Sequence, residues 1–259
     1  MGHVRLGKLA SSRKWRDVVA LLSRGADVSV LADAVATAAE NELISARGDP
    51  VLACAVWLLT QLPLAARSDN FAAELTKLGF ARGSEHSLFN IVAGLSQAVD
   101  RQVTSSQDRS DLGELARQAA AESLSILVGA QMPTLFGSSA EDFRIELAKF
   151  ASKDRFALLA RDFFARLTYK TLDYYISRVL PDFIGPGRPL PSLGQQDAFH
   201  AGLQHHCSEA SVIVETFAAG WFSKANFQGK LTPQAAQGFT DYALKKLRNE
   251  LRARRADDA

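Results

Sequence analysis

Apolar residues recur along most of this chain at intervals of three and four positions, the spacing that places them on one face of an α-helix. Almost no stretch alternates apolar and polar residues as a β-strand does. Two helix-start signals agree, because Asp49 precedes Pro50 and Thr232 precedes Pro233. The pattern predicts helices over residues 12–24, 29–46, 50–62, 70–79, 85–103, 111–130, 139–150, 153–180, 195–223 and 233–254.

These elements predict an all-α protein, an irregular multi-helix bundle of about ten helices. Residues 12–130 also fit a stack of helical hairpins. The segment from Leu180 to Ser192 holds four of the eight prolines, so no helix runs through it, and its apolar residues favour a packed loop over a flexible linker. We predict a helical N-terminal half (1–135) and an aromatic-rich helical C-terminal half (136–259), with one continuous domain as the alternative.

Charge is distributed unevenly although the net charge is only +2. Residues 1–25 carry six Lys and Arg against one Asp, and residues 26–142 carry 15 acidic residues against seven basic ones. The last predicted helix is basic again. Such polarity is typical of a polyanion-binding end, or of two parts of one protein that dock on each other.

Composition favours a globular protein in a reducing compartment. The chain is 47% hydrophobic and 22% charged, close to the globular average. Its two cysteines, Cys54 and Cys207, lie far apart, and no long apolar segment stands near the N-terminus. The apolar run from Val51 to Leu59 is nine residues long, against the roughly 20 that a membrane-spanning helix needs. We therefore expect a cytoplasmic protein with no membrane contact.

The helix predicted over 153–180 is apolar around most of its circumference, which predicts the most buried element of the chain. Its narrow polar sector contains Arg155, Asp162, Arg166 and Asp173, whose spacings of seven, four and seven place them on one face. Two interpretations of this polar sector stay open. It is either a solvated face or a half-buried charged seam that meets a ligand or partner.

Potential ligands and acid–base groups are densest between Asp197 and Glu209, where His200, His205, His206 and Cys207 lie. Imidazole, thiolate and carboxylate are ligands that zinc prefers, but one helix seldom supplies a complete tetrahedral site. We predict no metal and no cofactor here. An enzyme with a site near His200–Glu209 stays as an alternative, although no known catalytic motif occurs and no catalytic residue is predicted.

The C-terminal half carries the best candidates for a binding surface. Nine of the 22 aromatic residues lie between Phe143 and Phe183, and seven more lie between Phe199 and Tyr242. Trp221 and Phe222 either close the core at a helix end or form an exposed aromatic anchor. On the last helix, a basic stripe runs beside a leucine stripe that would pack on the body, and it consists of Lys245, Arg248, Arg252 and Arg255.

The sequence therefore favours a non-catalytic intracellular helical adaptor, or a subunit of a larger assembly, that docks a protein partner through its C-terminal half. The predicted contact residues are the basic stripe with Trp221 and Phe222, and an acidic surface on the partner fits them. A nucleic-acid-associated protein that uses the basic N-terminal segment and the basic last helix is the first alternative. The sequence leaves the oligomeric state open.

Overall fold

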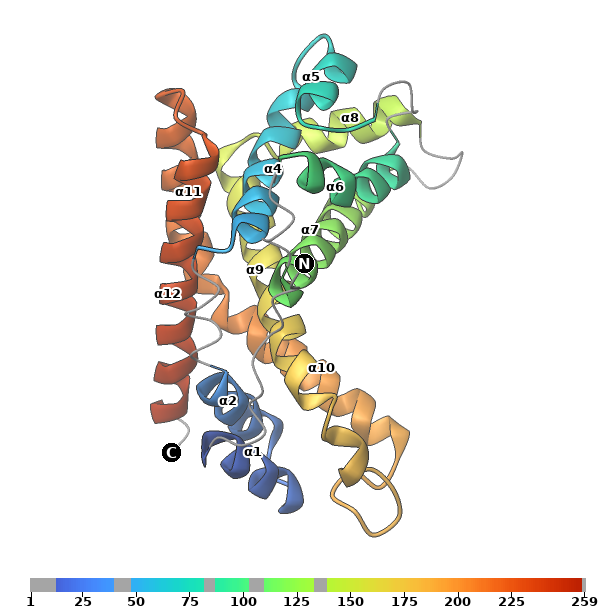
Figure 1. The fold of residues 1–259 in the computed structure, drawn as a ribbon, viewed down its shortest axis with the longest axis vertical. Coiled ribbons are helices and arrows are strands. Elements are labelled where there is room, and N and C mark those ends of the chain that lie inside the picture. Colours follow the sequence, from blue (N-terminus) through green and yellow to red (C-terminus); the bar gives the residue numbers. More distant parts are fainter. Residues whose placement is uncertain (1–12, 40–47, 82–86, 103–109, 133–138, 258–259) are drawn as a thin grey trace.

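The computed structural model describes residues 13–39, 48–81, 87–102, 110–132 and 139–257, with the side chains of a few of these left out. These residues form eleven α-helices, one short 3-10 helix and no strand, which confirms the all-α prediction (Figure 1). The helices are α1 (Arg13–Ser23), α2 (Val28–Ala38), α4 (Pro50–Ala66), α5 (Phe71–Lys77), α6 (Leu88–Gln102), α7 (Asp111–Gly129), α8 (Ala140–Lys149), α9 (Lys153–Ile176), α10 (Leu193–Ala210), α11 (Val212–Phe227) and α12 (Pro233–Asp257), with η3 (Leu180–Phe183) after α9.

Helices α4, α7 and α9 form the centre of the fold, with α7 packed against both of the others. Helix α4 begins as predicted, because the Asp49 carboxylate accepts the Leu52 N–H at 2.8 Å and Pro50 occupies the first turn. Helix α7 approaches α4 closely at Gly113, where an added Cβ would lie only 2.8 Å from Val51. This glycine sets the distance between the two helices.

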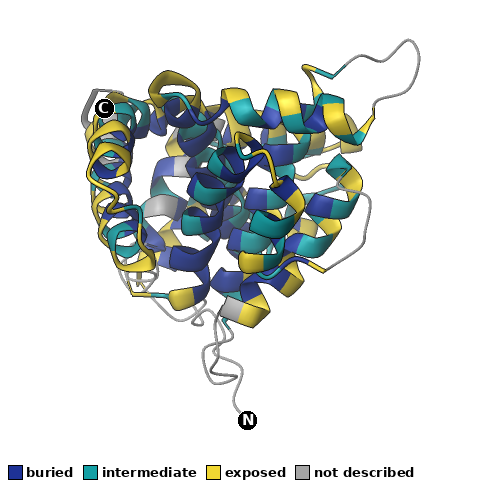
Figure 2. Ribbon diagram, turned by 90° about the horizontal axis from the view of Figure 1, so that it is seen from above, coloured by how far each residue is buried: buried dark blue, intermediate teal, exposed yellow. Residues whose placement is uncertain are grey.

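Two helical hairpins pack at the edges of this centre. Helices α1 and α2 lie together beside α10 and the far end of α12, and α11 and α12 lie side by side along another edge (Figure 1). Buried residues gather on the inward sides of the helices and exposed residues on the outward sides (Figure 2). One apolar core connects residues from Trp15 to Leu251, so both predicted halves contribute to it.

The segment after α9 is a packed loop. Leu180 is buried, and Phe183, Ile184 and Leu190 pack against the core. An isolated bridge joins Ile184 to Leu190 across the turn. The apolar residues that favoured a packed loop in the sequence make these contacts.

Several predicted helix boundaries were wrong. The helix predicted over 29–46 ends at Ala38, and the helix predicted over 153–180 ends at Ile176. The single helix predicted over 195–223 is two helices, because α10 ends at Ala210 and α11 begins at Val212, with the buried Ser211 between them. The helix predicted to end at residue 62 continues to Ala66 through Pro63. Proline removes one N–H near the end of a helix, and the burial of Leu62, Ala65 and Ala66 offsets that loss. Within the described ranges, no helix has the length and apolar character needed to cross a bilayer.

Candidate functional site

The predicted basic stripe lies on a helix that is firmly packed. Leu244, Leu247 and Leu251 are buried, as their spacing predicted. Lys245 is exposed, whereas Arg248 is half-buried with its Nη2 3.5 Å from the Asn249 Oδ1. The side chains of Arg252 and Arg255 lie outside the described residues. The structure thus places two of the four stripe residues, and only one of those two is fully exposed.

The aromatic prediction needs a correction at Phe222. This ring is 1% exposed and stacks on Phe156 with centroids 4.3 Å apart, so it belongs to the core and offers no surface to a partner. Phe222 turns inward because it lies four residues after the buried Ala218 on the inner face of α11. Trp221 points differently: it is half-buried and stacks on Phe239 of α12, with centroids 4.2 Å apart.

Two further rings complete an aromatic face between α11 and α12 that the sequence did not single out. Phe217 is half-buried and meets the 46% exposed Tyr242 edge to face, with centroids 4.8 Å apart. The Lys246 ammonium lies 5.5 Å from the Tyr242 ring centroid. The spacing of four between Phe217 and Trp221, and between Tyr242 and Lys246, was the available signal. We call Phe217, Trp221, Tyr242, Lys245 and Lys246 the aromatic–basic face.

The charged sector of α9 is a half-buried seam between helices from Asp162 to Asp173, whereas Arg155 is exposed. Asp162 accepts two hydrogen bonds from Arg166, at 2.6 and 3.1 Å. Glu122 of α7 pairs with Arg166 at 3.6 Å and with Lys170 at 2.6 Å. Burial disfavours the charge of Arg166, but the hydrogen bond to Asp162 and the two nearby carboxylates raise its pKa above the ordinary value.

The two candidate regions of the sequence meet at one end of this seam. Asp173 of α9 and His200 of α10 are 3.2 Å apart, measured from Oδ1 to Nδ1, and the Tyr169 hydroxyl is 3.3 Å from the same nitrogen. Burial raises the pKa of Asp173, although the charges of His200 and Lys170 oppose that rise. The hydrogen bond at Nδ1 is with the Tyr169 hydroxyl, because Asp173 Oδ1 makes no hydrogen bond among the described residues. The carboxylate is therefore a close charge neighbour of His200 and does not orient the imidazole through a hydrogen bond.

The other candidate ligands of α10 diverge from His200. His206 is buried and its Nε2 lies 3.3 Å from Asp33 of α2, whereas His205 is exposed. Glu209 faces Arg161 at 3.8 Å. Burial raises the pKa of the Cys207 thiol to about 12, so this sulfur is not a ready nucleophile. Among the described residues, no three His, Cys, Asp or Glu side chains are grouped so that they could hold a metal ion.

Comparisons of this chain with protein-family models, with curated proteins and with solved structures find no match.

Proposed function

We propose that this protein is a non-catalytic adaptor or assembly subunit that docks an acidic protein partner through its aromatic–basic face. The observation that carries the proposal is the half-exposed cluster of Phe217, Trp221 and Tyr242, beside Lys245 and Lys246. Aromatic rings and basic groups dominate the binding energy of protein interfaces.

The rings are held in place before any partner arrives. Trp221 stacks on the buried Phe239, and Phe217 packs against both Phe239 and Tyr242. A ring that is already fixed loses little conformational freedom on binding, which favours affinity. The two exposed or half-exposed lysines add long-range attraction to an acidic surface. The buried, unpaired cysteines support a cytoplasmic location for this role.

The test compares proteins retained from native extract by the immobilised chain and its variants. Tyr242→Ala and Lys245→Glu should each reduce recovery of a specific partner, by about tenfold for the ring and less for the charge. The matched controls are Phe89→Ala, which removes a 78% exposed ring on α6, and Lys153→Glu, which reverses an exposed charge on α9. If all four variants recover the same amount of this partner, the proposal is contradicted.

Nucleic-acid binding is the second candidate, and one observation favours it. Helix α1 carries the exposed Arg13, Lys14 and Arg16, and it packs on α2, which in turn contacts α12. The two basic segments therefore lie toward one end of the molecule (Figure 1). Binding to DNA or RNA that weakens steeply with salt, and that Arg13→Glu with Arg16→Glu reduces while Tyr242→Ala does not, would favour this candidate.

A further inference from the structure

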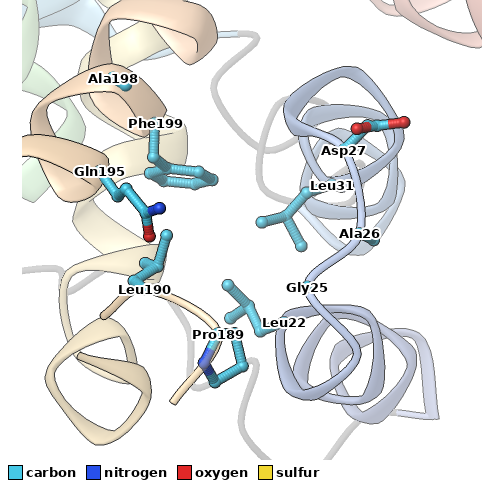
Figure 3. Close-up of a pocket in the computed structure, with 10 residues that line it drawn as sticks. All are labelled: Leu22, Gly25, Ala26, Asp27, Leu31, Pro189, Leu190, Gln195, Ala198 and Phe199. Carbon is cyan, nitrogen blue, oxygen red and sulfur yellow. The ribbon is translucent and has the colours of Figure 1, made fainter. Parts of the chain in front are cut away.

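A cavity of about 380 Å³ lies between the α1–α2 turn and the start of α10 (Figure 3), and no residue of the aromatic–basic face lines it. One wall comes from Leu22 of α1 and Leu31 of α2. The opposite wall comes from Pro189 and Leu190 of the packed loop and from Phe199 of α10. This volume lies within the range of small-molecule sites, about 300–1,000 Å³.

Both walls are held by hydrogen bonds that do not involve a ligand. In the α1–α2 turn, Gly25 has φ +66°, and the Ala26 N–H donates to the Leu21 carbonyl at 3.1 Å. In the loop, the Leu190 N–H donates to the Phe183 carbonyl at 3.1 Å, and Arg188 donates to the Asp182 carbonyl at 2.7 Å. The cavity is therefore formed in advance, which lowers the cost of binding.

The side chains directed into the cavity are apolar, and the one polar side chain at its edge is the amide of Gln195. Figure 3 shows Leu22, Leu31 and Phe199 directed toward the middle of the cavity, with the Gln195 amide beside Leu190 at its edge. The same view shows the Asp27 carboxylate directed away. The described lining residues include no Lys, Arg or His, and within the described part of the chain the side-chain amide of Gln195 makes no hydrogen bond. An anionic ligand would lose its hydration here with no opposite charge to replace it, and the carboxylate of Asp27 is directed away from a cationic one.

We propose that this cavity binds a neutral, largely apolar small molecule, ring-shaped on the side that meets Phe199, with one hydrogen-bonding group for Gln195. Aromatic side chains prefer edge or offset contacts with another ring, and Phe199 offers such a contact from a fixed position. The amide both donates and accepts, so it can pair with an N–H, a hydroxyl or a carbonyl of the ligand. Neither wall belongs to the aromatic–basic face, so the proposal does not rest on the proposed function.

The experiment titrates the full chain with indole and with indene, two neutral bicyclic probes of nearly equal shape, of which only indole carries an N–H. Binding is followed by nuclear magnetic resonance. Indole should bind wild-type protein and show contacts between its protons and the methyl groups of Leu22, Leu31 and Leu190. Indole should also bind more tightly than indene by about fivefold, the affinity that one net hydrogen bond of ordinary strength adds.

Three variants test where indole binds and whether the Gln195 amide contributes to binding. Ala198 is exposed at the rim, so Ala198→Trp should block the cavity and weaken both probes at least tenfold. The control Ala20→Trp adds the same ring to an exposed alanine outside the cavity and should bind as wild type does. Gln195→Leu should remove the preference for indole while indene binding is kept.

Absence of indole binding to the wild-type chain would overturn the proposal. Contacts between indole and methyl groups outside the cavity would do the same, and this readout needs no variant to fold. Unchanged affinity in a folded Ala198→Trp protein would overturn the location, and an unchanged indole preference in Gln195→Leu would overturn the role of the amide.

Discussion

Helices α4 and α9 are both central, but they are buried in different ways. Helix α4 buries 13 of its 17 residues and contains no charged side chain. Helix α9 buries 12 of its 24 residues and pairs Arg161, Lys170 and Asp173 with charged groups of α11, α7 and α10. The prediction that α9 is the most buried element was therefore wrong. A helix without charges can be covered on every side, whereas α9 must leave its ionised groups near water.

The largest expected effect comes from making a cavity in either helix. Leu58 of α4 and Phe163 of α9 are both 0% exposed. Leu58→Ala should lower the free energy of unfolding by about 2–5 kcal/mol, and Phe163→Ala by about 3–5 kcal/mol, because each leaves a void. Denaturant unfolding measures both changes. As a control, Phe227→Ala removes a ring that is 93% exposed and should change stability by less than about 0.5 kcal/mol. No loss in Phe163→Ala would show that α9 is peripheral.

The next effect tests how tightly α7 packs on α4. Gly113→Ala places a Cβ 2.8 Å from two atoms of Val51, so the helices must separate, and we expect a loss of about 1–3 kcal/mol. Gly220→Ala is the matched control, because a Cβ there meets nothing within 4 Å. That substitution should raise stability by about 0.5–1 kcal/mol, the difference between Gly and Ala inside a helix. If both substitutions stabilise the protein, α7 and α4 have room for a Cβ at Gly113 and the close approach to Val51 does not limit their packing.

Much of the fold could be predicted from local signals. The cap at Asp49, the apolar spacing of α12 and the apolar residues of the loop at Leu180 each act on their own neighbours, so the sequence reports them directly. The break at Ser211 was missed because a serine inside a helix pattern gives no stop signal. Its hydroxyl donates to the Cys207 carbonyl, but Thr171 and Thr240 make the same bond inside continuous helices, so this bond does not mark the break.

The candidate sites were less predictable because they depend on contacts between helices. The sequence placed Asp173 and His200 in two separate candidate regions, and only the packing of α10 on α9 brings them together. Phe222 and Trp221 are adjacent in the chain, yet one faces the core and the other faces α12. Periodicity alone does not say which side of α11 is inner, since α11 is apolar on several sides.

A smaller effect should distinguish α9 from α4 by whether the stability cost of a substitution depends on salt concentration. Glu122 is 45% exposed and holds both Arg166 and Lys170 of α9. Glu122→Gln should lower stability by about 0.2–1 kcal/mol at low salt and by less at high salt, because exposed pairs are weak and screened. Thermal unfolding in a salt series measures this change. The cost of Leu58→Ala on α4 should be the same at every salt concentration, and a salt-independent cost for Glu122→Gln would contradict the seam.

The smallest effect concerns pH and Asp173. Burial raises the pKa of this carboxyl above its ordinary value of about 3.9, with the charges of His200 and Lys170 opposing the rise. The folded state therefore holds the proton more tightly than the unfolded state. The stability from this group is complete below about pH 3.9 and is lost as pH rises through the raised pKa.

Asp173→Asn replaces the carboxyl with an uncharged side chain of the same shape. The variant should therefore gain stability relative to wild type as pH rises from about 3.9 through the raised pKa of Asp173. Thermal midpoints of both proteins from pH 3 to 7 measure the difference between them, and this difference should move in favour of Asp173→Asn as pH rises. Leu58→Ala should show a constant difference from wild type over the same range, since α4 carries no charged side chain. If Asp173→Asn instead loses stability relative to wild type as pH rises, then the pairing with His200 and Lys170 outweighs burial, and the seam stabilises the ionised carboxylate.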